Sequence, residues 1–443
     1  MTIPTDHGIH YAVEAWLKDQ VSALHHIRKT LHKYPEPGWR EFRTASTVAQ
    51  ILDECGFNLS LGQDVIEAEA RMAVPENQEL DLWYQRAESD NLPFLEAFKG
   101  GFTGLVGTKV FTKEGPTLAL RFDLDALTLG EVVAEDQPAH MEKYKSIHEG
   151  VMHGCGHDGH ASLGIMVAKL IAAIGDQFPL KGTLKLIFQP AEEGVRGAKS
   201  MVANVDDVDM LLGAHFWPVG SYSVIGGLRG LLATSKLDAQ FFGTPAHAGK
   251  QPELGNNALL AAAQAMVALQ GAPRHSQGVT RINVGTLQGG TDRNIIPAFA
   301  KMQLETRGST TEAEAFIRQY AIKALEHSAA MQGCRVEIDQ VGSAPSGDSS
   351  PGLAQFVETL ALKEAGTQRV HGDHQAKVSE DFAYLMKAVQ DRGGQASFIG
   401  LGMDSRLKLH SHDFDIPQED FEHGCRVIAH VLVECLHLDY NTN

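Results

Sequence analysis

The first third of the chain shows apolar residues at the spacing of amphipathic helices. From about residue 11 this pattern continues up to the two prolines of "YPEPG", where a helix has to end. Residues 40–55 show the same helical spacing of apolar residues, which ends at Gly56. Residues 63–100 are charged and rich in helix-favouring residues, without a strand pattern. We therefore predict two helices followed by an inserted helical segment.

Short, continuous apolar runs come next and are typical of buried strands. They read "GFTGLVGTKV", "TLALRFDLDAL", "GTLKLIFQP" and "DMLLGAHFWP". A helical pattern over residues 160–177 separates the second run from the third, so strands and helices alternate. This order predicts an α/β sheet with helices on its faces. Reactive side chains in such sheets gather at strand ends.

The order of elements changes between residues 231 and 342. Strand, helix, two strands, helix and strand follow one another there, which is a compact βαββαβ unit. The α/β pattern then returns and ends in a helix over 419–438. We therefore predict one α/β domain in two parts, residues 1–230 and 343–443, with a separate domain inserted at 231–342.

Composition limits the classes of protein to consider. A chain of 443 residues with 43% hydrophobic residues is long enough for two cores. Its formal net charge of -17, without a block of lysine or arginine, argues against nucleic acid or an anionic membrane as partner. The N-terminus lacks the apolar core of a signal peptide, and the 5 cysteines are scattered. We therefore expect a soluble, cytoplasmic protein.

The stretch "MHGCGHDGH" at residues 152–160 concentrates side chains that bind metals. Similar side chains follow predicted strands or helices elsewhere. Thiolate, imidazole and carboxylate together suit zinc, or manganese and cobalt where carboxylates dominate. If one glutamate of the Glu-Glu pair is left as a base, five protein ligands remain. Five are too many for one catalytic zinc but suit two ions that share a ligand and a bridging water. The candidates are Cys155, His157, Glu192, Glu193, His215 and His410.

Each candidate also has a plainer interpretation. A Glu-Glu pair is usually a solvated acidic turn, but Glu192 and Glu193 follow an apolar run. On extended backbone their side chains diverge, so that one can bind metal while the other acts as general base. Alone, His215 or His410 would more often be a hydrogen-bonded histidine near a core, and Cys155 a buried thiol. The prediction therefore depends on the whole set.

The ordered motifs resemble those of the di-metal amidohydrolases and peptidases that include aminoacylase, hippurate hydrolase and glutamate carboxypeptidase. This resemblance implies a metallopeptidase-type catalytic domain with a central mixed sheet flanked by helices. It also implies that the inserted βαββαβ unit is a ferredoxin-like dimerisation, or lid, domain. The motifs span nearly the whole chain: "LHKYPEPGWREFRTA", "RFDLDAL", "MHGCGHDGH", "FQPAEEG", "GTPAHAG", "RNIIPAFAKMQLETRG", "SEDFAYL" and "LHSHDFDI".

The resemblance assigns roles to individual residues. Glu192 matches the family's general base, and Asp125 matches an aspartate that orients a metal-binding histidine. His247 matches a histidine that reaches the partner subunit's site and stabilises the oxyanion. Asn294 and Arg307 match residues near the substrate's carboxylate. The matched metal ligands are Cys155, His157, Glu193, His215 and His410.

The resemblance also implies an activity. It predicts hydrolysis of an amide bond with two divalent ions, manganese or zinc, and its closest branch acts on an N-acyl glutamate. Another N-acyl or aromatic-acyl amino acid, such as hippurate, is the alternative substrate. A non-catalytic partner subunit is a further alternative, although every ligand is present. A homodimer and a heterodimer with a homologous subunit, formed through the inserted domain, both stay open. Many relatives place an aspartate where this chain has Cys155, so the resemblance does not identify the metal.

Overall fold

Two sheets organise the computed structural model, which describes residues 7–135 and 137–437. The larger has eight strands in the order β1-β2-β4-β3-β5-β12-β6-β11, and the four at its centre are mutually parallel. The carboxyl ends of those four strands therefore share one edge of the sheet. The strands are β1 (Asn58–Leu61), β2 (Leu105–Val110), β3 (Thr117–Asp123), β4 (Thr183–Gln189), β5 (Met210–Trp217), β6 (Ser223–Ile225), β11 (Arg369–Val370) and β12 (Gln395–Gly402).

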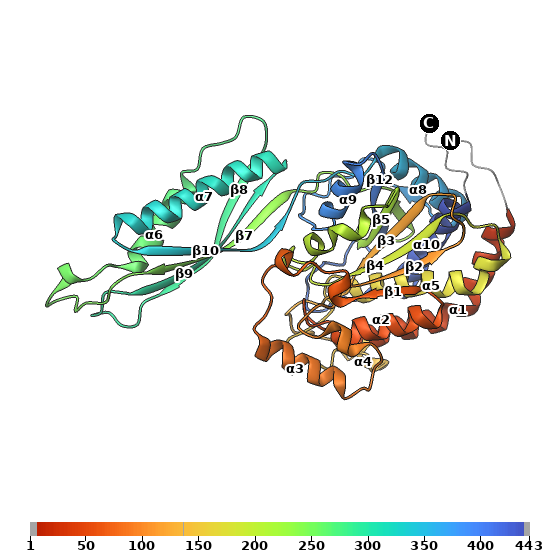
Figure 1. Ribbon diagram of the computed structural model, residues 1–443, viewed down its shortest axis with the longest axis horizontal. Helices are drawn as coiled ribbons and strands as arrows, with labels where there is room; N and C mark the ends of the chain where they lie inside the picture. The colour runs from red at the N-terminus through yellow and green to blue at the C-terminus, as the bar shows by residue number, and fades with distance from the viewer. Residues whose placement is uncertain (1–6, 136, 438–443) are drawn as a thin grey trace.

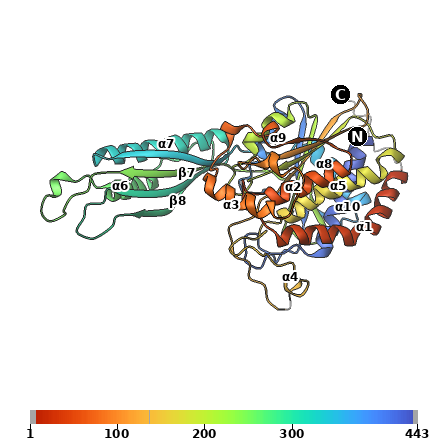
Figure 2. The same cartoon turned by 60° about the horizontal axis from the view of Figure 1, so that its bottom comes forward.

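Helices cover both faces of this sheet. One group packs around the buried helix α5, while α9 lies near the opposite face (Figure 2). These helices are α1 (His7–Lys33), α2 (Phe42–Glu54), α5 (His157–Ile174), α8 (Pro351–Glu364), α9 (Ala383–Gln390) and α10 (Gln418–His437), while the short helix α4 (Pro138–Met141) belongs to the connection between β3 and α5.

Glycine allows α5 to lie very close to the sheet. A Cβ on Gly164 would be 2.6 Å from the rings of Phe122 and Phe188, so a larger residue would push the helix away. Because successive strand residues point to opposite faces, Arg121 lies on the other side of the sheet and contacts the ring of Phe382. The close packing of α5 fixes the position of its first residue, His157.

The smaller sheet extends to one side of the larger domain (Figure 1). Its strand order is β10-β7-β9-β8, all antiparallel. Two helices cover one face and bury a separate apolar core. The elements are β7 (Ala233–Phe242), α6 (Ala258–Gln270), β8 (Thr280–Gly289), β9 (Phe299–Gly308), α7 (Thr311–Met331) and β10 (Arg335–Ala344).

The predicted fold class is confirmed, since a mixed sheet flanked by helices carries an inserted βαββαβ unit. The segment 63–100 is helical, with α3 (Asn77–Glu88) and the short 3-10 turns η1 (Gly62–Asp64), η2 (Ala68–Ala70) and η3 (Leu95–Phe98). The first six and last six residues of the predicted catalytic domain lie outside the described residues.

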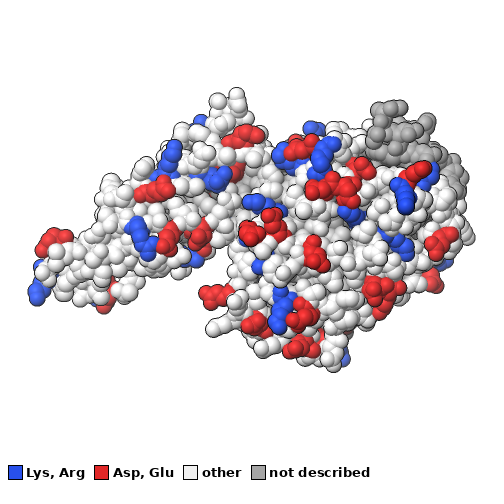
Figure 3. Space-filling model, viewed as in Figure 1, with Lys and Arg blue, Asp and Glu red and all other residues white. Residues whose placement is uncertain are grey.

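Within the part of the chain that the structure describes, one helical stretch, residues 157–177, is long and apolar enough by composition to cross a membrane. Its most apolar window is 83% buried inside the fold, as expected for a core helix. Figure 3 shows acidic and basic side chains interspersed over the visible face, without a broad basic area.

Candidate functional site

The candidate ligands meet at the carboxyl edge of the central strands. Asp123 ends β3, and Glu192 follows the end of β4. His215 lies near the end of β5, and His157 is the first residue of α5. The left-handed conformation of Gly156, with φ of +87°, turns the chain between Cys155 and that helix. Residues distant in the sequence are thus brought to one buried cluster.

Two groups of potential ligand atoms share the Cys155 thiol. In one group, Cys155 Sγ lies 3.4 Å from His215 Nε2, and His157 is the third member. In the other, Cys155 Sγ lies 3.3 Å from His410 Nε2, which is 3.5 Å from Glu193 Oε1. Within each group, all ligand atoms lie within 4.8 Å of one another. This arrangement can hold two ions with a shared thiolate between them.

The hydrogen bonding of these side chains also fits metal ligands. Among the described residues, His157 Nε2 and Glu193 Oε1 are buried without a hydrogen-bond partner, and they lie 4.0 Å apart. Leaving such atoms unpaired is costly unless something else satisfies them. A divalent ion satisfies an imidazole nitrogen and a carboxylate oxygen at once, so the sulfur, nitrogen and oxygen donors present here fit zinc or manganese.

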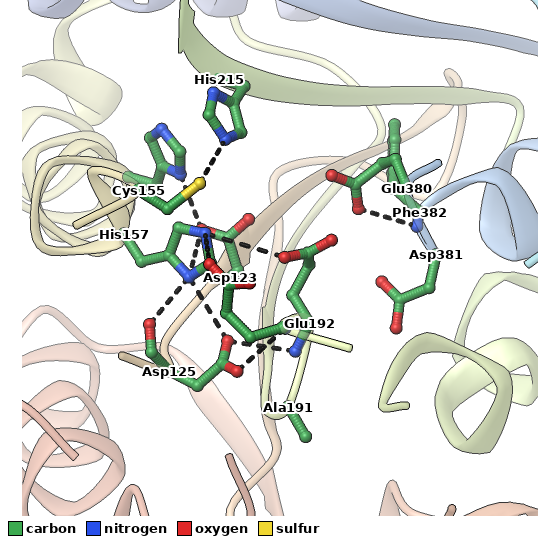
Figure 4. A network of polar contacts seen from close by, with 12 residues as sticks. Asp123, Asp125, Cys155, His157, Ala191, Glu192, His215, Glu380, Asp381 and Phe382 are labelled. Carbon is green, nitrogen blue, oxygen red and sulfur yellow. Dashed lines mark hydrogen bonds and ion pairs between the residues drawn. The ribbon is translucent and has the colours of Figure 1, made fainter. Parts of the chain in front are cut away.

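Asp125 connects the histidine to the two glutamates. Its carboxylate oxygens accept hydrogen bonds from the backbone N–H groups of Glu192 and Glu193, both at 3.0 Å. Its backbone carbonyl lies 2.8 Å from His157 Nδ1, as expected if Nδ1–H donates to it. The lone pair of His157 Nε2 then points towards the cluster, while Asp125 holds the Glu192–Glu193 turn in place (Figure 4).

His160 supports the site without entering either group that contains Cys155. The backbone N–H of Phe216 donates to His160 Nε2 at 3.0 Å, so the proton of this ring is on Nδ1. Nδ1–H in turn donates to Asp123 at 2.7 Å. His160 therefore connects the ends of β3 and β5 beside His215.

Glu192 lies at the border between the ligands and a second acidic group. Its Oε2 is 3.8 Å from His157 Nε2, and Glu380 and Asp381 approach it from the other side (Figure 4). Burial and the carboxylates of Glu380 and Glu193 raise the pKa of Glu192 well above its ordinary value. A carboxyl group with a raised pKa can both accept and return a proton near neutral pH.

Arg121 compensates the charge of this acidic group. The guanidinium is fully buried and lies 2.7 Å from Asp123, 3.3 Å from Glu380 and 3.4 Å from Asp381. Buried carboxylates need such a partner because desolvation penalises their charge. The sequence motifs contain these residues, but no role for Arg121, Glu380 or Asp381 was predicted from them. A signal was available for Arg121, because a charged residue interrupts the apolar run "TLALRFDLDAL".

The protonation of the ligands links metal binding to pH. Burial, followed by the carboxylate of Glu193, raises the pKa of the Cys155 thiol well above its ordinary value. Burial likewise raises the pKa of Glu193 to about 7. Because metals bind the deprotonated forms, ions that enter this cluster must displace protons.

A cavity of about 410 Å³ opens beside Glu193. The catalytic domain, the segment 63–100 and the inserted sheet all contribute to its walls, the last two through Ala73 and through Lys236 and Val341. Strand β10 contacts the glutamate turn directly, because the Ser343 N–H donates to the carbonyl of Val195 at 2.9 Å. The helical insertion therefore borders the cavity next to the candidate metal ligands.

The remaining predicted residues lie at opposite ends of the inserted sheet. The pairing of Ala233 with Gly308 marks the end next to the catalytic domain, where Arg307 lies. His247 and Asn294 lie in two adjacent loops beyond the far end, where the Ala248 N–H donates to the carbonyl of Asn294 at 3.0 Å. The ten residues of β7 span about 30 Å. The structure therefore does not bring His247 and Asn294 to the ligands of their own chain.

Comparisons with known proteins agree with this architecture. Residues 119–434 match the model of peptidase family M20/M25/M40. An indole-3-acetyl-aspartic acid hydrolase from Enterobacter agglomerans is 42% identical over 88% of this chain and 91% of that protein. One of the subunits of p-aminobenzoyl-glutamate hydrolase from Escherichia coli (strain K12) is 39% identical over 89% of this chain and 92% of that protein. The crystal structure of an aminobenzoyl-glutamate utilization protein from Klebsiella pneumoniae has a TM-score of 0.80 and 36% identity, covering 95% of this chain and 98% of that one.

Proposed function

The chain belongs to peptidase family M20/M25/M40 and is an amide-bond hydrolase, and from this we propose that it cleaves p-aminobenzoyl-glutamate to p-aminobenzoate and glutamate. The named activity of the Escherichia coli relative supports this substrate. One structural observation carries the proposal: two groups of ligands share Cys155, and Glu192 stands beside them.

The proposed ligands are Cys155, His157 and His215 for one ion, and Cys155, Glu193 and His410 for the other. When bound, two divalent cations, manganese or zinc, supply Lewis acidity that lowers the pKa of water and polarises an amide carbonyl.

Glu192 moves the proton in this mechanism. Its carboxylate accepts a proton from the attacking water and returns it to the leaving amine nitrogen, as one carboxyl group can act first as base and then as acid. The raised pKa of Glu192 makes its carboxylate a stronger proton acceptor. Asp125 keeps Glu192 in position because its carboxylate accepts a hydrogen bond from the backbone N–H of Glu192.

His247 is proposed to stabilise the oxyanion in the site of a partner subunit. Its Nδ1 accepts hydrogen bonds from the backbone N–H groups of Gly249 and Lys250, both at 3.1 Å. The ring proton is therefore on Nε2, which can donate to a negative oxygen. Asn294, in the adjacent loop, would approach the same substrate. Arg307 would bind the substrate's carboxylate and would come from the subunit whose metal site holds that substrate.

Pairing through the inserted domain is proposed for the same reason. Helix α6 exposes apolar side chains, of which Val267 is 74% and Leu260 44% accessible. Strand β8 leaves one edge of the sheet open. The partner is a second copy or a homologous subunit. The free cysteines, Cys155 included, suit the cytoplasm as the place of the reaction.

A second candidate substrate has its own support. The relative from Enterobacter agglomerans is named for indole-3-acetyl-aspartic acid, and its identity to this chain is 42%. Both named substrates join an aromatic acyl or aminoaroyl group to a dicarboxylic amino acid. Hippurate carries only one carboxylate and therefore serves as the contrasting substrate.

The proposal is tested by incubating the purified chain, loaded with manganese or zinc, with each conjugate and measuring the released acid by chromatography. We expect p-aminobenzoate to be released from p-aminobenzoyl-glutamate faster than the corresponding acids are released from indole-3-acetyl-aspartate and hippurate. Preferential cleavage of indole-3-acetyl-aspartate would select the second candidate. Cleavage of hippurate alone would contradict both.

A further inference from the structure

A second cavity, of about 400 Å³, lies where the inserted sheet joins the catalytic domain. We call it the junction cavity. Its charged lining consists of four cations and a single carboxylate, in a chain whose formal net charge is -17. Two of the cations come from the inserted sheet and two from the catalytic domain: Arg281, Arg307, Arg229, Lys377 and, as the carboxylate, Asp348.

The two arginines of the inserted sheet lie directly opposite each other. Arg281 on β8 pairs in register with Arg307 on β9, so both side chains lie on the same face. Like charges in this arrangement repel and destabilise a sheet. Glu305 offsets part of the cost, because Arg307 Nε lies 3.0 Å from Glu305 Oε1. Arg281 has no ion pair among the residues described, so a positive charge is left facing the cavity.

Lys377 reaches the cavity from the catalytic domain. Its φ of +55° is left-handed, a conformation that non-glycine residues adopt at a cost. Backbone hydrogen bonds hold this segment, including one from the Leu232 N–H to the Val378 carbonyl at 2.8 Å. The Lys377 side chain forms no ion pair within the described part of the chain. Arg229 differs, since it lies 3.3 Å from Asp373 and is already paired.

The junction cavity adjoins the candidate active site. Arg307 Nη1 lies 3.5 Å from Ser379 Oγ, and Ser379 precedes Glu380. A carboxylate oxygen of Glu380 lies within 4.8 Å of one of Glu192. A small substrate whose amide lies beside Glu192 could therefore place a carboxylate among these cations.

We propose that Arg281 and Lys377 bind the side-chain carboxylate of a dicarboxylic amino acid, next to the carboxylate assigned to Arg307. This inference rests on the proposed function and extends it to the class of amino acid released. The planar guanidinium of Arg281 suits a bidentate carboxylate. The two carboxylates of such a substrate would offset the charges of Arg281 and Lys377, which have no ion pair among the described residues, while Arg307 is partly neutralised by Glu305. A glutamine conjugate has the same shape as a glutamate conjugate but lacks this charge.

The test compares Arg281→Gln with wild type on p-aminobenzoyl-glutamate and p-aminobenzoyl-glutamine. We expect wild type to prefer the glutamate conjugate, and Arg281→Gln to lower the ratio of the two kcat/KM values at least about tenfold, with Arg281→Lys in between. Arg335→Gln is the matched control, because Arg335 is exposed at the far end of the same sheet. An Arg281→Gln ratio within twofold of wild type would overturn the inference.

A binding measurement separates this inference from the proposed function. Calorimetry with L-glutamate and L-glutamine on the metal-loaded full chain needs no turnover. If wild type cleaves neither conjugate, the proposed function fails, yet a glutamate preference that Arg281→Gln abolishes would still support the carboxylate site. Equal binding of the two amino acids to wild type would overturn it.

Discussion

At the scale of single residues, the hydrogen bonds that Asp125 accepts organise the site. Asp125 accepts from both backbone N–H groups of the glutamate turn and, through its carbonyl, binds His157. Those contacts leave the metal-facing atoms of His157 and Glu193 unpaired. In the proposed function, the groups around the proposed ligands therefore prepare the site for cations as much as those ligands do.

The role of Glu192 can be separated from that of the ligands. Glu192→Gln keeps the shape of the side chain but cannot accept a proton from water. We expect kcat to fall by about 10²–10⁴ while each chain still binds two ions, measured by elemental analysis. Loss of metal together with activity would instead assign Glu192 to the ligands.

At the scale of elements, close backbone contacts connect the inserted sheet to the glutamate turn. Strand β10 has an irregular register between Gln340 and Gly342. A Cβ on Gly342 would lie 2.2 Å from the Gly194 carbonyl, next to the turn that holds Glu192 and Glu193. Glycine at this position thus permits the contact between the two domains.

Gly342→Ala should therefore displace the glutamate turn. We expect a several-fold loss of kcat/KM and a loss of stability of about 1–3 kcal/mol, measured by steady-state kinetics and urea unfolding. Gly352→Ala is the control, since the nearest atom to its added Cβ is a glutamine oxygen at 3.4 Å. Equal behaviour of the two variants would show that the contact is unimportant.

Helix α1 stabilises the start of α5 through a buried charged network. His32 lies 3.1 Å from Asp158 and 3.0 Å from Glu131, and Arg28 lies 3.1 Å from the same Asp158. Burial alone would lower the pKa of His32, but the hydrogen bonds to Asp158 and Glu131 outweigh it and raise the pKa to about 10.

This raised pKa predicts a stability that depends on pH. Because protonated His32 is favoured in the folded state, its contribution is complete below the unfolded pKa of about 6.5 and is lost as the pH rises to about 10. The destabilisation caused by His32→Gln should shrink by roughly 2–4 kcal/mol between pH 6 and pH 10. Unfolding of the metal-free chain measures it, with His327→Gln, an exposed helical site, as control. A destabilisation independent of pH would contradict the charged network.

Many of the strands could be predicted from the sequence. Long apolar runs correctly indicated β2, β3, β4 and β5. Strands β1, β6 and β11 were missed because two to four residues carry no readable period. The contact of Arg121 with Glu380 and Asp381 was also missed. These residues lie about 260 positions apart in the sequence, and only the order of the strands in the sheet brings them together.

At the scale of the whole molecule, the two ends of the inserted sheet have different neighbours. The sheet extends away from the catalytic domain (Figure 1). Arg307 and Arg281 lie at the end next to the catalytic domain of their own chain, whereas His247 lies beyond the far end. The sequence motifs contain His247 and Arg307, but only the length of β7 shows how far His247 lies from its own ligands.

Hybrid dimers test whether His247 acts across subunits. His247→Ala and Glu192→Gln are each expected to be inactive alone. Coexpressed in equal amounts, they should recover about one quarter of wild-type activity, because half of the dimers are hybrid and each hybrid has one intact site. A mixture no more active than its components would place His247 in the site of its own chain or outside the reaction.

The proposed hydrolysis depends on two divalent ions, which the two groups of residues that share Cys155 would hold. Anomalous scattering from crystals of the manganese-loaded chain locates such ions directly. We predict two peaks, one among Cys155, His157 and His215 and the other among Cys155, Glu193 and His410. A single peak, or peaks at Glu192, Glu380 and Asp381 instead, would contradict the two-ion site and the role of Glu192 as general base.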